Sequence, residues 1–134
     1  MGIELVKDSI DLGIVVRDPE ASLRFYRDTL GLDYQGEMAM PGGGVMHRLL
    51  CGTSLIKLVV HAKTPEAAAA PGGLVGASGY RYWTITVSNL DALTETCEAA
   101  GYKIAVKPRE IRPGIKIAMI EDPDGNWVEL LETS

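Results

Sequence analysis

The sequence repeats one order of secondary structure twice, and this repeat constrains the fold more than any single motif. In the first half, alternating and helical patterns predict a strand, a helix and three more strands, at 10–17, 18–31, 32–40, 45–51 and 54–62. The second half predicts the same order at 80–87, 89–101, 102–107, 115–120 and 126–131. The repeat therefore indicates an α+β protein made of two tandem βαβββ modules.

The two halves also align residue by residue. Ile14 and Val16 correspond to Ile85 and Val87, and the stretch 52–58 corresponds to 124–130. A helix covers only one face of such a sheet, so the other face is expected to close against the sister module. We expect a single domain over 1–134, with module 1 at about 8–62, a linker at 63–79 and module 2 at 80–134. Together the modules would form a curved mixed sheet, or half-barrel, around a central cavity.

The end of the chain carries the clearest turn. Asp122-Pro123-Asp124-Gly125 lies between two apolar runs, and its proline and glycine are typical of a tight reversal between strands. The outgoing strand alternates, so Glu129 shares a face with Trp127 and Leu131. A carboxylate between large apolar side chains indicates either an exposed strand face or a ligand cavity with one acid in it.

The strand faces opposite the two helices carry four polar side chains at equivalent points of the repeat. These candidate catalytic residues lie on the first or last strand of each half: Asp11, Lys57, Tyr82 and Glu129. Four further residues are candidates for contacting a substrate beside them: His47, Tyr80, Trp127 and Leu55. Cavity walls of low polarity could push the pKa values of the two acids apart.

Composition excludes several classes of protein. The net charge of -5 and the lack of a basic cluster argue against nucleic-acid binding, and no apolar run approaches a membrane span. We expect no signal peptide, because the first residues lack a charged and then apolar leader. The two cysteines form no disulfide pattern, so a reducing cytoplasm is the expected compartment.

The paired modules resemble the vicinal oxygen chelate superfamily, which includes glyoxalase I, bleomycin-resistance proteins and extradiol dioxygenases. The resemblance covers nearly the whole chain and is carried mainly by the segments 12–26, 30–32 and 121–130. It implies the fold, but not one function, because the superfamily includes isomerases, lyases, dioxygenases and proteins that only bind. It also implies a small-molecule ligand and a homodimer.

The resemblance implies metal ligands at the four equivalent positions, where histidine, glutamate or glutamine is usual. Only Glu129 matches, because Asp11 and Tyr82 replace histidine and Lys57 replaces glutamate. A protonated lysine has no lone pair to donate and would repel a divalent cation. We therefore predict no cofactor. A metal site built from His47, Asp11 and Glu129 is left open, although Lys57 argues against it.

Three functions remain as alternatives. The first is metal-free acid–base chemistry of the isomerase or lyase type, in which Lys57 stands where the ion stood and stabilises charge on a substrate oxygen. The second is sequestration of a planar molecule by aromatic stacking, as in bleomycin-resistance proteins. The third is a metal-dependent glyoxalase or dioxygenase. A purely structural role, in which Lys57 only neutralises the acids, competes with all three.

Overall fold

The computed structural model describes residues 2–134, and the chain divides into two compact units, Met1–Pro65 and Glu66–Ser134. Each unit is one βαβββ module with a four-stranded mixed sheet, so the predicted fold class is confirmed. Most of the stretch 63–79, the expected linker, belongs to the second unit. The shared central cavity stays a prediction.

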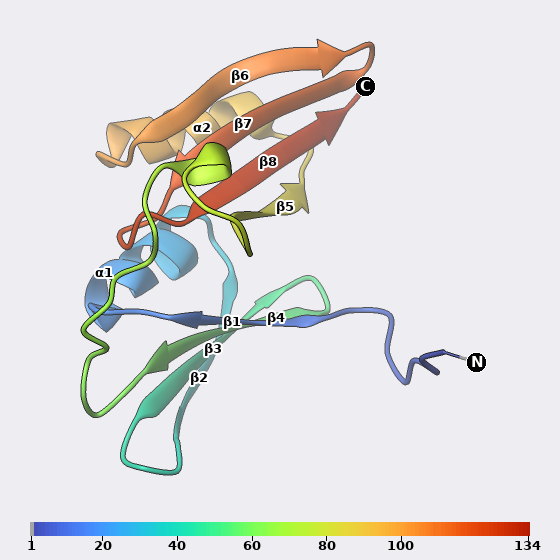
Figure 1. Ribbon diagram of the computed structural model, residues 1–134. Coiled ribbons are helices and arrows are strands. Elements are labelled where there is room, and N and C mark those ends of the chain that lie inside the picture. Colours follow the sequence, from blue (N-terminus) through green and yellow to red (C-terminus); the bar gives the residue numbers. More distant parts are fainter. Residues whose placement is uncertain (1) are drawn as a thin grey trace. The chain divides into compact units, whose positions relative to one another are not determined.

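Module 1 places its first strand at one edge of the sheet, beside the last strand. Its elements are β1 (Asp11–Val15), α1 (Pro19–Leu23), η1 (Arg24–Thr29), β2 (Asp33–Ala39), β3 (Val45–Cys51) and β4 (Ser54–Val60). The strand order is β1-β4-β3-β2, with β1 parallel to β4 and the other pairs antiparallel (Figure 1). The parallel pair requires the helical crossover that the sequence pattern predicted.

The helix of module 1 begins and ends as predicted, but its second half is a π turn. The Asp18 side chain accepts a hydrogen bond from the Ala21 amide at 3.2 Å, and Pro19 occupies the first helical position. After Leu23 the helix widens into the π turn η1, where the Leu30 amide donates to the Phe25 carbonyl five residues earlier. Periodicity alone gave no sign of this inserted residue.

Module 2 repeats the topology. Its elements are η2 (Gly73–Val75), β5 (Tyr82–Thr86), α2 (Leu90–Ala99), β6 (Ile104–Arg112), β7 (Ile115–Glu121) and β8 (Trp127–Thr133). The strand order is β5-β8-β7-β6, with β5 parallel to β8. In Figure 1, α2 lies behind this sheet, and the short turn η2 lies on the other side, over β8.

Each sheet has a helix face and a second face, which we call the site face. In module 1 the helix face carries the buried Leu49, Ile56 and Leu58, and in module 2 it carries the buried Val128 and Leu130. Even-numbered residues of β4 and β8 thus form the core, and odd-numbered ones lie on the site faces. Among residues 2–134, no helix is long and apolar enough to cross a membrane.

Leu130→Ala should destabilise the protein by about 2–5 kcal/mol, because Leu130 is fully buried and its truncation leaves a cavity in the module 2 core. Urea denaturation measures the change. Ile111→Ala is the control, since Ile111 is 42% exposed and its truncation should change stability by no more than about 0.5 kcal/mol. Equal effects of the two substitutions would contradict the assigned core.

Candidate functional site

The turn before β8 fixes the position of Glu129. The buried Asp122 carboxylate accepts hydrogen bonds from the backbone amides of Asp124 at 2.9 Å and Asn126 at 2.8 Å. Gly125 closes the turn with a φ of +87°, a conformation that glycine adopts without strain. This rigid reversal sets which residues of β7 and β8 face each other, and it confirms the predicted hairpin.

Glu129 lies on the site face of module 2, held by a hydroxyl group. It pairs in register with Thr84 of β5 and Met119 of β7, and the Thr84 hydroxyl donates a hydrogen bond of 2.8 Å to Glu129 Oε1. Within residues 2–134, Glu129 forms no ion pair. One carboxylate oxygen is thus held by Thr84, and no hydrogen bond to Oε2 is present among residues 2–134. Sequence reasoning missed Thr84, although it occupies the repeat position of Gly13.

Trp127 shares this face and lies under the segment at 70–76. A side chain on the buried Gly73 would overlap the indole ring, so the glycine packs directly against it. The Arg81 guanidinium donates to the carbonyls of Gly73 at 2.7 Å, Ala70 at 2.9 Å and Pro71 at 3.2 Å. Part of the expected linker is therefore an ordered cover for Trp127.

The two tyrosines predicted for the site lie near its edge. Tyr82 begins β5, pairs in register with Trp127 and is 48% exposed. Tyr80 precedes the strand, and its side chain is fully exposed in this structure. Tyr82 therefore shares the site face with Glu129, whereas no contact of Tyr80 with that face is seen among the described residues.

The site face of module 1 brings together Asp11 and Lys57. The Asp11 carboxylate forms ion pairs with Lys7 at 2.7 Å and Lys57 at 3.1 Å. Hydrogen bonds from Lys7 and then Lys57 lower the pKa of Asp11 below its usual value. Lys57 pairs in register with Gly13, which has no side chain, so the ammonium reaches the neighbouring Asp11. Leu55 is the register partner of Asp11 and lies on the same face.

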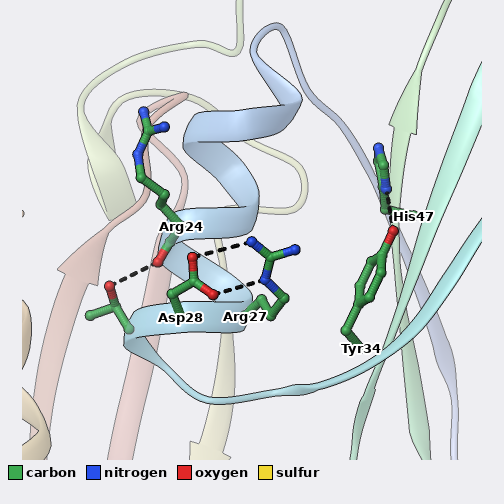
Figure 2. Close-up of polar contacts among 6 residues, drawn as sticks. Arg24, Arg27, Asp28, Tyr34 and His47 are labelled. Carbon is green, nitrogen blue, oxygen red and sulfur yellow. Dashed lines mark hydrogen bonds and ion pairs between the residues drawn. The ribbon is translucent and has the colours of Figure 1, made fainter.

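His47 lies on the opposite face of the same sheet. It pairs in register with the buried Leu58, and its Nδ1 lies 2.9 Å from the Tyr34 hydroxyl (Figure 2). Arg27 of η1 places its guanidinium carbon 5.5 Å from the centre of the Tyr34 ring. These contacts put His47 on the helix face, so the structure does not bring it together with Asp11 and Lys57.

The sequence matches the family model of the Glyoxalase/Bleomycin resistance protein/Dioxygenase superfamily over residues 9–130. The chain belongs to this superfamily. Its members include small-molecule-binding proteins as well as enzymes, so membership defines the fold but not the function. Among curated proteins, none matches this sequence significantly.

Solved structures of superfamily members show the same fold. A glyoxalase family protein from Bacillus cereus is 19% identical, with a TM-score of 0.82 over 98% of this chain and 96% of that chain. Glyoxalase I from Leishmania major is 20% identical, with a TM-score of 0.70 over 91% and 84%. TnmS3, an antibiotic-binding protein from Streptomyces sp. CB03234, is 22% identical, with a TM-score of 0.68 over 100% and 99%.

The four positions at which the resemblance implied metal ligands are engaged differently in the two modules. In module 1, the Asp11 carboxylate is paired with two ammonium groups, those of Lys7 and Lys57. In module 2, Glu129 is accompanied by a phenol and by Thr84, whose hydroxyl proton is donated to the carboxylate. No group of three His, Cys, Asp or Glu side chains gathers within either module, as far as residues 2–134 are concerned.

Asp11→Asn should destabilise the protein near neutral pH and have little effect in acid. The folded state lowers the pKa of Asp11, so its stabilising contribution is present above the ordinary aspartate pKa of about 3.9. That contribution is lost as the pH falls through the lowered pKa. Urea denaturation of both proteins near neutral pH and at about pH 3 measures how the loss of stability depends on pH. Asp33→Asn is the control, since Asp33 forms no ion pair with any described residue. An equal loss at both pH values would contradict the ion pairs.

Gly73→Ala should uncover Trp127, because the added methyl group would overlap the indole ring and displace the segment. In a Trp83→Phe background, where Trp127 is the remaining tryptophan, acrylamide quenching of fluorescence should increase. Gly79→Ala is the matched control, since Gly79 also has a positive φ (+100°) but nothing lies near its Cβ position. Quenching that is the same in both variants would contradict the cover.

Proposed function

We propose that this superfamily member is a small-molecule enzyme that uses metal-free acid–base chemistry next to a substrate carbonyl. The observation that carries the proposal is Glu129 itself, a carboxylate on a largely apolar site face with one oxygen held by Thr84 and no cation paired to it among the described residues. A carboxylate held in one orientation with a free oxygen is suited to act as a general base.

In the proposed reaction, Glu129 Oε2 removes a proton from the carbon next to the carbonyl. The electron pair of the broken C–H bond forms the enolate, and its negative charge develops on the carbonyl oxygen. Returning the proton to the same or a neighbouring carbon gives epimerisation or isomerisation, and loss of a leaving group gives elimination. Tyr82 shares the site face of module 2 with Glu129, and its hydroxyl group carries a proton to donate to such an oxyanion.

The Thr84 hydroxyl has a positioning role in this proposal. Its hydrogen bond holds Oε1 beside β5, which leaves Oε2 as the oxygen that would remove the proton. Thr84→Val removes the bond with little change of volume. A hydrogen bond to a charged group contributes about 1.5–3 kcal/mol, so the rate should fall about tenfold or more.

Proton exchange in D₂O tests the base directly. Small 2-oxo acids and hydroxyketones are incubated with the protein, and NMR follows the loss of the C–H signal next to the carbonyl. Glu129→Gln should slow exchange by about 10²–10⁴-fold, the usual contribution of a general base. Glu98→Gln is the control, because it removes one charge from an exposed position of α2 without touching the site face.

Three results would overturn the proposal. If Glu129→Gln exchanged protons as fast as the wild type, Glu129 would not be the base. If elemental analysis after incubation with zinc, iron and manganese found nearly one metal ion per chain, lost in Glu129→Gln, the metal-dependent alternative would replace it. Tight binding of a ligand with no turnover in the wild type would support sequestration instead. The expected cytoplasmic location and homodimer remain part of this proposal.

A further inference from the structure

Two basic side chains stand directly opposite each other on the site face of module 1. Arg48 of β3 pairs in register with Lys57 of β4, so both lie on the face that carries Asp11. Gly13 of β1 is the next residue beyond Lys57, and Gly36 of β2 is the next beyond Arg48. Across the four strands the order is therefore Gly13, Lys57, Arg48, Gly36, which we call the basic row.

The two positive charges of this row are only partly balanced by acids. Like charges directly opposite on neighbouring strands destabilise a sheet. Lys57 forms an ion pair with Asp11 of β1, which borders β4 on the side opposite to Arg48. Asp11 also pairs with Lys7, so it is shared between two ammonium groups. Arg48 forms no ion pair within the described part of the chain. The Arg48 guanidinium therefore lies beside the Lys57 ammonium and has no carboxylate partner of its own. A bound anion would stabilise this arrangement.

The two glycines leave space next to these charges. A Cβ atom placed on Gly13 or Gly36 would have nothing within 4 Å. Gly36 has a φ of +100° at a β-bulge, which explains why it is glycine. Gly13 is not among the residues with positive φ, so its backbone imposes no such requirement. A glycine inside a strand often marks the close approach of a ligand, and here it lies beside Lys57.

The neighbouring rows of the same face are mainly apolar. On one side the register places Val15, Val59, Met46 and Met38, and on the other side Leu55 and Leu50 lie between Asp11 and Asp33. Apolar surroundings lower the local dielectric and strengthen a charged hydrogen bond. They also suit the carbon skeleton of a small ligand whose oxyanion group contacts the basic row.

We propose that the basic row binds the oxyanion group, a carboxylate or a phosphate, of an anionic small molecule. The Arg48 guanidinium offers a planar fork of N–H donors that matches such a group with two parallel hydrogen bonds, and the Lys57 ammonium adds a third donor. This inference goes beyond the proposed function, because it gives module 1 a class of ligand that does not depend on the reaction at Glu129.

Titration of the full-length protein with inorganic phosphate and with acetate, followed by amide NMR, tests the basic row. In the wild type, shifts should concentrate at Gly13, Gly36, Arg48 and Lys57 for at least one of the two anions. Arg48→Gln and Lys57→Gln should each raise the dissociation constant about tenfold or more. Arg24→Gln is the matched control, because Arg24 lies in the π turn of the same module and its loss should leave binding unchanged.

Gly13→Val tests whether anion binding needs the space beside Lys57 as well as the charges of the basic row. It keeps every charge and places a branched side chain, well tolerated in strands, beside Lys57. Binding of the anion should weaken, while the amide spectrum shows a folded protein.

Two outcomes would overturn the inference: neither anion shifts the row in the wild type, or Arg24→Gln weakens binding as much as Arg48→Gln. Neither anion depends on a general base for this binding, so failure of the proposed acid–base reaction would leave this titration unchanged. The two proposals can therefore fail separately.

Discussion

The parallel pair between the first and last strand of each module is the constraint on which both site faces depend. It sets Gly13 opposite Lys57 in module 1 and Thr84 opposite Glu129 in module 2. Side chains alternate with a period of two, so a slip of one residue would turn every polar side chain of these strands toward the helix. The buried residues between them, such as Leu58 and Leu130, make that slip costly. Packing of the core on the helix face therefore keeps the polar side chains on the site face.

Equivalent positions of the repeat have acquired opposite chemistry through their neighbours. Lys57 and Glu129 occupy the same point of β4 and β8. Gly13 beside Lys57 leaves room for the ammonium to reach Asp11, whereas Thr84 beside Glu129 donates a hydrogen bond to the carboxylate. A lysine beside threonine would lose that space, and a glutamate beside glycine would lose its donor. The first-strand residue thus decides how the last-strand charge is held.

Sequence alternation predicted the fold and the faces of Asp11, Lys57, Tyr82 and Glu129, because strand periodicity is local. The contact of Thr84 with Glu129 and the placement of Arg48 opposite Lys57 depend on how the strands pair. The sequence of one strand does not show its pairing. The face of His47 could have been predicted from the two-residue turn between β3 and β4. This turn pairs Cys51 with Ser54, and the register then sets His47 opposite Leu58, on the helix face. The cover at 70–76 had no periodic signal, because it depends on a glycine packed against an indole ring.

Two side-chain cations present their charge to a ligand differently from a metal ion. A divalent ion concentrates two charges at one point, about 2 Å from each ligand atom, and polarises the substrate oxygens that it coordinates. In the basic row the charges are on two side chains whose Cβ atoms are about 5 Å apart, as for any directly opposite pair. Such a spread suits an oxyanion group with two or three oxygens better than a lone carbonyl oxygen.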